Sequence, residues 1–130
     1  MSVEPLDTPS APPVLGPYVP AVRAGDWVVL AGQLGLDPST GSLVEGGAAA
    51  ETIRAMANVK AILADVGVPM SAIAKTTIFV TDLADFAAVN EAYAEALDGH
   101  TPVRSTVQVA ALPAGARVEI EAWAHAPAPP

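Results

Sequence analysis

Residues 74–97 read AKTTIFVTDLADFAAVNEAYAEAL, and this stretch decides the expected fold. Its first part, AKTTIFVT, is rich in β-branched residues and predicts a strand. Asp82 follows as a helix N-cap, and Asp85 adds a negative charge that favours the start of a helix. The residues that then recur at helical spacing are Phe86, Val89, Tyr93 and Leu97. A strand followed directly by an amphipathic helix predicts a domain that mixes both element types.

The same patterns predict the remaining elements. YVPAV at 18–22 and WVVLAG at 27–32 predict strands joined by a turn at Gly25. Residues 48–66 predict a helix that ends at Gly67, a glycine suited to the left-handed cap. The expected apolar face of that helix is Ile53, Met56, Val59, Leu63 and Val66. VRSTVQVA at 103–110 and RVEIEAWAH at 117–125 predict two final strands, so the order is ββ(β)αβαββ.

Two helices cover only one face of a sheet of this size. The segments WVVL and TIFV nevertheless carry apolar side chains on both faces. We therefore expect an α+β fold, a mixed sheet with both helices on one face, whose other face is covered by a second copy of the chain.

The 130 residues predict one domain, at 16–126. Seven of the thirteen prolines lie in 1–13 and 127–130, so we expect an N-terminal tail at 1–15 and a C-terminal tail at 127–130. Because proline cannot donate to a backbone ladder, these tails are expected to be disordered or held by a neighbouring subunit. They should contribute little to the core.

The composition excludes several classes of function. The chain has no cysteine, which excludes disulfides, thiolate nucleophiles and cysteine-based metal sites and suits a cytoplasmic protein. Its net charge of −8 disfavours binding to a nucleic acid. No apolar run is long enough to span a membrane, and the N-terminus lacks the pattern of a signal peptide, so we expect a cytoplasmic protein. His100 and His125 have no partner at metal-ligand spacing, so no metal site is expected.

Candidate site residues lie in the last two strands, which are expected to form a hairpin around ALPAGA. In one register Arg104 faces Glu121 and Thr106 faces Glu119, and all four side chains share a face. One interpretation is a cross-strand ion pair that sets the register. The other is a guanidinium that binds a substrate carboxylate, with a nearby carboxylate that acts on a water molecule.

Two further residues allow both a structural and a functional interpretation. Asn90 falls on the buried face of the helix that follows Asp82, where its amide either bonds a loop backbone or lines a pocket. Tyr18 is either a core ring with a solvated hydroxyl or a proton donor.

Four blocks of the sequence together resemble one known family. The blocks are GPYVPAVRAGDWVVLAGQLGLDPSTG, NVKAILADVG, KTTIFVTDLADFAAVNEAYAE and PVRSTVQVAALPAGARVEIEA. They are similar to the RidA/YjgF family of enamine/imine deaminases. The resemblance implies a chorismate-mutase-like fold and a homotrimer around a central barrel, with pockets between subunits. It also implies hydrolysis of reactive 2-enamino and 2-imino acids to 2-keto acids and ammonia, without metal or cofactor.

The resemblance also implies roles for particular residues. Arg104 matches the residue that binds the substrate carboxylate, and Glu119 matches the one that positions the attacking water. The positions that match the lining of the family's pocket are Tyr18, Gly32, Asn90 and Thr106.

The chain departs from the family's pattern at two positions. Ala31 and Pro20 stand where many members have Ser and Gln. Three alternatives therefore stay open: the imine deaminase, a member with a different small acidic substrate, and a non-catalytic trimer that binds metabolites or acts like a chaperone. Links of the family to ribonuclease activity fit poorly with the charge of −8.

Overall fold

A computed structural model describes residues 2–129, which form one six-stranded mixed sheet and two α-helices. The strands lie in the order β1-β2-β3-β6-β4-β5. All neighbours pair antiparallel except β4 and β5, which are parallel. The strands are β1 Glu4–Pro5, β2 Ala21–Ala24, β3 Trp27–Leu34, β4 Ile73–Val80, β5 Val103–Gln108 and β6 Val118–His125; the helices are α1 Gly47–Asp65 and α2 Phe86–Leu97.

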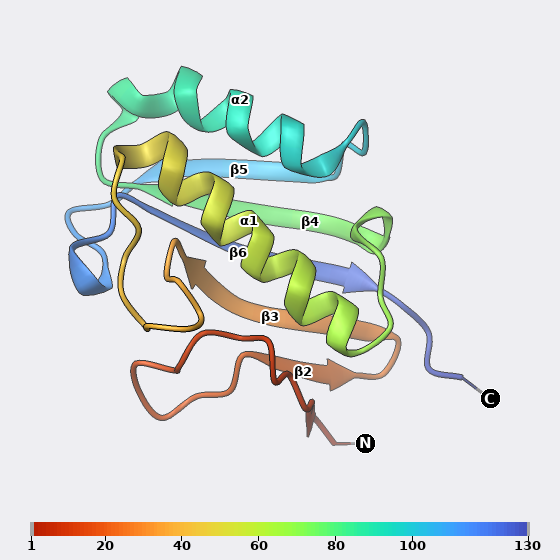
Figure 1. The fold of residues 1–130 in the computed structure, drawn as a ribbon. Coiled ribbons are helices and arrows are strands. Elements are labelled where there is room, and N and C mark those ends of the chain that lie inside the picture. The colour runs from red at the N-terminus through yellow and green to blue at the C-terminus, as the bar shows by residue number, and fades with distance from the viewer. Residues whose placement is uncertain (1, 130) are drawn as a thin grey trace.

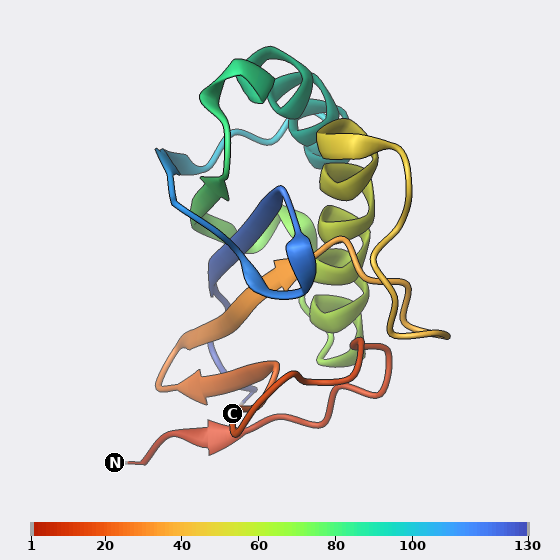
Figure 2. The ribbon, with the colours of Figure 1, turned by 90° about the vertical axis from the view of Figure 1, so that its left-hand side faces the viewer.

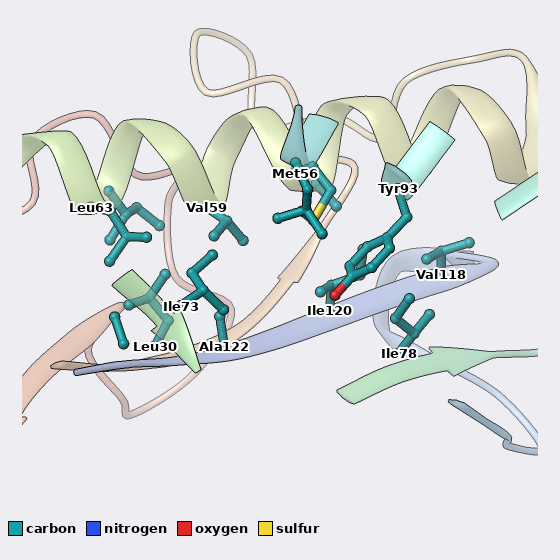
Figure 3. Close-up of a cluster of buried hydrophobic side chains, with 14 of the residues drawn as sticks. Leu30, Met56, Val59, Leu63, Ile73, Ile78, Tyr93, Val118, Ile120 and Ala122 are labelled. Atoms are coloured by element: carbon teal, nitrogen blue, oxygen red, sulfur yellow. The ribbon is translucent and has the colours of Figure 1, made fainter. Parts of the chain in front are cut away.

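Both helices lie side by side on one face of the sheet (Figures 1 and 2). The core fills the space between α1 and the sheet, where Met56, Val59 and Leu63 pack toward the strands (Figure 3). From β6, every second residue between Val118 and Ala124 is buried there. The opposite face of the sheet is left without a covering layer in a single chain, as the sequence predicts.

The local predictions are largely confirmed. Asp82 Oδ1 accepts a hydrogen bond from the Ala84 amide at 2.9 Å and opens the turn that leads into α2. Gly67 adopts a φ of 74° just after α1, as a C-terminal cap requires. The prediction is wrong for Ile53, which is 58% exposed because it lies on the outer side of α1. Within residues 2–129, no helix is both long and apolar enough to cross a membrane.

The predicted hairpin between the last two strands is wrong. β4 lies between β5 and β6 and pairs with both. β4, α2 and β5 form a strand–helix–strand unit, and such a crossover brings its strands together in parallel. Arg104 therefore lies opposite Thr76, and Glu121 lies opposite Thr77, so no Arg104–Glu121 cross-strand pair forms.

The N-terminal segment packs against its own domain, contrary to the expectation that it contributes little. Glu4 and Pro5 pair with β2 at the edge of the sheet, a place where proline is tolerated. Leu6 packs on the core. The Ser10 amide and hydroxyl each donate to Asp65, the last residue of α1, at 2.8 Å. Residues 127–129 of the C-terminal segment are exposed.

Deleting residues 2–10 should therefore destabilise the domain. The deletion removes the β1 pairing, the Leu6 contacts and two bonds to a carboxylate. We expect a loss on the order of 2–4 kcal/mol, or about 10 °C in the thermal midpoint. Removing residues 127–130 is the matched control and should leave the midpoint unchanged. Equal midpoints for the two truncations would show that the N-terminal packing adds no stability.

Candidate functional site

Arg104 lies at the rim of the molecule, on the same face as the helices. It belongs to β5, the edge strand of the sheet, and its guanidinium carbon lies 5.2 Å from the centre of the Tyr93 ring and 5.5 Å from that of Phe86. An open pocket of about 390 Å³ adjoins it. The pocket is lined by Asn90, Tyr93, Ala94, Leu97, Gly99, His100, Thr101, Pro102 and Arg104. We call this region the Arg104 half-site.

Two polar atoms beside this region lack a partner. Asn90 Oδ1 and Thr106 Oγ1 are buried and accept no hydrogen bond from the residues that the structure describes. Asn90 lines the pocket from α2, and Thr106 is two residues beyond Arg104 on the same face of β5. Because buried polar atoms in proteins are nearly always bonded, these two favour a polar ligand or ordered water here.

Glu119 belongs to a second site with different surroundings. It lines a small, partly open cavity of about 30 Å³ together with Tyr18 and Gly32. The same cavity is bounded by the N-terminal residues Pro12, Pro13, Val14 and Leu15 and by Pro20, Gln33, Leu34, Leu36 and Pro113. A volume of this size holds about one water molecule. We call this region the Glu119 half-site.

The surroundings of Glu119 raise the pKa of its carboxyl group. Partial burial is the larger cause, because it disfavours the charged form, and the nearby negative charge of Glu121 is the second. A carboxyl group with a raised pKa exchanges protons more readily near neutral pH than an ordinary glutamate does.

The structure divides the predicted site residues into these two groups. Tyr18, Gly32 and Glu119 come together, and so do Asn90 and Arg104, with Thr106 beside them. Glu119 alternates along β6 with the buried Val118 and Ile120, so it points to the uncovered face, whereas Arg104 points to the face of α2. The expectation that Arg104, Thr106, Glu119 and Glu121 share one face is therefore wrong.

Two sets of residues that shape these regions are not predicted as site residues by the sequence. The Arg104 guanidinium lies over the rings of both Phe86 and Tyr93, and residues 12–15 line the Glu119 cavity. The spacing of Phe86 and Tyr93, seven residues and two helical turns apart, gave the only available signal, since it places both rings on one side of α2. The proline content of residues 12–15 favours a tail, so it gives no indication that these residues line a cavity.

Gly32 allows Glu119 to lie against the backbone of β3. A Cβ atom at this position would lie 2.7 Å from Glu119 Cδ. Gly32→Ala should therefore displace the carboxylate, which can move, and leave the fold intact. We expect the turnover of a reaction that uses this carboxylate to fall about tenfold or more, because a small displacement of a reacting group has an effect of that order.

Gly35→Ala is the matched control for this variant. Its Cβ would meet the α1 backbone, 2.7 Å from Glu51 Cα, which cannot move aside. Gly35→Ala should lower the thermal midpoint, whereas Gly32→Ala should lower activity at an unchanged midpoint. A fully active Gly32→Ala protein would show that the position of Glu119 is unimportant.

No group of three or more His, Cys, Asp or Glu side chains able to hold a metal ion occurs within residues 2–129. The polar side chains that line the two half-sites include the Arg104 guanidinium, the Glu119 carboxylate, the Asn90 and Gln33 amides, the Tyr18 hydroxyl and the His100 imidazole.

Comparison with known proteins identifies the family. Residues 8–126 match the family model described as Endoribonuclease L-PSP, and the chain belongs to this family, the RidA/YjgF family. Protein DfrA of Myxococcus xanthus is 46% identical over 95% of this chain and 96% of its own length. The mouse 2-iminobutanoate/2-iminopropanoate deaminase is 44% identical over 92% of this chain and 88% of its own length. The structure is also similar to that of E. coli TdcF with bound serine, at a TM-score of 0.88 and 40% identity over 94% of this chain and 98% of that one. The expected family and the mixed sheet with two helices are thereby confirmed.

Proposed function

We propose that this protein hydrolyses 2-imino and 2-enamino acids to 2-keto acids and ammonia, at sites shared between the subunits of a homotrimer. The observation that carries the proposal is the placement of Arg104 and Glu119 on opposite faces of one sheet. Each half-site holds part of the required chemistry. The names of the mammalian relatives and the serine bound to E. coli TdcF support a small amino-acid-like substrate.

A second copy of the chain would complete the site and cover the bare face of the sheet. That face exposes large apolar side chains from three strands, namely Trp27, Val103, Val107 and Trp123. Such a surface is typical of an interface between subunits. In a closed ring, the edge strand β5 of one subunit would bring its Arg104 beside the Glu119 cavity of the next.

Arg104 would bind the substrate carboxylate. A guanidinium presents parallel N–H donors that match the two oxygens of a carboxylate, and this bidentate pairing fixes orientation as well as position. The pocket of about 390 Å³ leaves room for a short side chain beside it. The unpartnered oxygens of Asn90 and Thr106 would accept bonds from the iminium nitrogen or from ordered water.

Glu119 would activate a water molecule held in the cavity of about 30 Å³. The water oxygen bonds to the iminium carbon while Glu119 takes one of its protons. Glu119 then returns the proton to the nitrogen of the carbinolamine, and the C–N bond breaks. The departing ammonia takes the hydroxyl proton, so iminium and water become keto acid and ammonium with Glu119 regenerated. A raised pKa suits a group that both accepts and donates a proton.

Co-expression of two impaired variants tests the shared site directly. Arg104→Ala and Glu119→Gln should each retain about a hundredth of the wild-type activity or less as pure trimers. If every site takes Arg104 from one subunit and Glu119 from the next, random mixing restores both groups at about a quarter of the sites. Activity is measured as keto-acid release beside a pyridoxal-phosphate dehydratase that acts on serine or threonine, with a trap for free imine.

The controls separate assembly from chemistry. Light scattering on each preparation should give the mass of a trimer. Co-expression of two gene copies that carry the same substitution should give no recovery of activity. A stable monomer, or co-expressed trimers without recovered activity, would contradict the shared site, and a wild-type trimer that releases no keto acid would contradict the deaminase function.

A different small acidic substrate is the second candidate. Pro20 lines the Glu119 cavity and Ala31 precedes Gly32 in β3, so neither position carries the glutamine amide or the serine hydroxyl that many family members have there. Arg104 still provides for an acidic group. A wild-type protein that binds 2-keto acids but does not release them from imines would favour this candidate.

A further inference from the structure

The Arg104 half-site contains a tyrosine that the reaction itself does not require. Tyr93 is 6% exposed, and its ring lies beneath the Arg104 guanidinium. Its hydroxyl is directed at the sheet (Figure 3), where it forms a hydrogen bond of 2.5 Å with Thr76 Oγ1. Thr76 is fully buried on β4 and lies directly opposite Arg104 in the parallel register. Tyr93 on α2 therefore contacts both Thr76 on β4 and Arg104 on β5, two residues that are register neighbours in the sheet.

We propose that Tyr93 is a positioning residue, which acts through Arg104 and is itself held in place by Thr76. This inference rests on the proposed function, because the group that it positions is the one that binds the substrate carboxylate. The Phe86 ring is a second aromatic neighbour of the guanidinium, whose central carbon lies 5.5 Å from the ring centre.

Contact with ring faces suits this purpose better than an ion pair does. A cation over an aromatic face is attracted by the ring quadrupole without using any of its N–H donors. The five donors of the guanidinium thus stay available for a carboxylate. A carboxylate partner from the protein would instead occupy the same donors and compete with the substrate.

The hydroxyl explains why a tyrosine occupies this position. A ring on α2 alone would fix Arg104 relative to the helix, but the bond to Thr76 fixes the ring relative to the sheet that carries Arg104. Burial raises the pKa of Tyr93, so the hydroxyl stays protonated and the bond persists at neutral pH. Without the bond to Thr76, the Tyr93 ring should still pack between α2 and the sheet, but its position should be less fixed.

The test compares two threonine variants with matched chemistry. Thr76→Val removes the bond to Tyr93 at nearly constant volume. Thr52→Val removes a hydroxyl that is equally buried and donates to the Ala48 carbonyl within α1, away from Arg104. We expect Thr76→Val and Tyr93→Phe to weaken the affinity for pyruvate and to raise KM about threefold to tenfold, with a smaller change in kcat. Thr52→Val should leave both unchanged.

A double-variant cycle separates positioning from stability. In an Arg104→Ala background, Thr76→Val should cause no further loss of pyruvate affinity, because the group that it positions is absent. A loss of the same size in both backgrounds, or unchanged affinity in Thr76→Val, would overturn the inference. Changes in the thermal midpoint do not enter this comparison.

A measurement without ligand keeps the inference separate from the proposed function. In the wild-type protein, the Arg104 δ-methylene protons should show an upfield ring-current shift in the NMR spectrum, and this shift should shrink in Thr76→Val but not in Thr52→Val. If wild-type protein bound no keto acid, the proposed function would fail, and the NMR comparison would still decide the positioning role. A shift that is unchanged in Thr76→Val would overturn that role.

Discussion

Arg104→Ala should lower kcat/KM for imine hydrolysis by about a hundredfold or more. In the proposed complex, the substitution removes two charge-assisted hydrogen bonds to the substrate carboxylate, each of which contributes about 1.5–3 kcal/mol. Both KM and kcat should suffer, because the carboxylate provides affinity and also orients the reacting carbon. The measurement is steady-state keto-acid release together with affinity for pyruvate, on preparations shown to be trimers.

Arg104→Lys separates the effect of the bidentate guanidinium geometry from that of the positive charge. An ammonium keeps the positive charge but cannot form two parallel bonds, and it makes a poorer contact with the faces of Phe86 and Tyr93. The lysine variant should therefore recover only part of the lost activity. Full activity in the alanine variant would mean that Arg104 only packs on the two rings and has no part in binding.

The elements of this fold could be predicted from the sequence because their signals are local. A helix at 48–66 and a strand at 74–81 are confirmed as Gly47–Asp65 and Ile73–Val80. Strand pairing depends instead on partners far apart in the chain. The turn-like ALPAGA suggested a hairpin, yet β6 inserts between β3 and β4.

A signal for the correct pairing was present in the sequence. A strand, a helix and a further strand in succession predict a parallel crossover, which would have placed β5 beside β4. That pairing sends Arg104 toward α2 and away from Glu119. The identity of the candidate residues followed from the resemblance to the family, but their division between two faces required the three-dimensional arrangement.

Glu119→Gln should lower turnover strongly and spare affinity for the keto-acid product. The amide keeps the shape of the side chain and some hydrogen bonding, but it cannot accept a proton from water. General base catalysis typically accounts for about a hundredfold or more, so a loss of that size in kcat is expected. The measurement is kcat beside the dissociation constant for pyruvate.

Glu121→Gln is the matched control, because Glu121 is two residues away on the same face of β6. Its turnover at neutral pH should be close to that of the wild type. The charge of Glu121 nevertheless helps to raise the pKa of Glu119. In the proposed reaction the active form of Glu119 is ionised, so wild-type activity should be lost as the pH falls through this raised pKa, at a higher pH than for an ordinary glutamate of about 4.3.

Removal of the Glu121 charge should therefore move the acid limb of the pH profile to lower pH. The shift should be incomplete, because burial, the larger cause of the raised pKa, remains in the variant. Glu119→Gln should abolish the acid limb along with most of the turnover. If Glu121→Gln proved inactive while Glu119→Gln kept its rate, the proton transfer would belong to Glu121 and the cavity beside Gly32 would have another purpose.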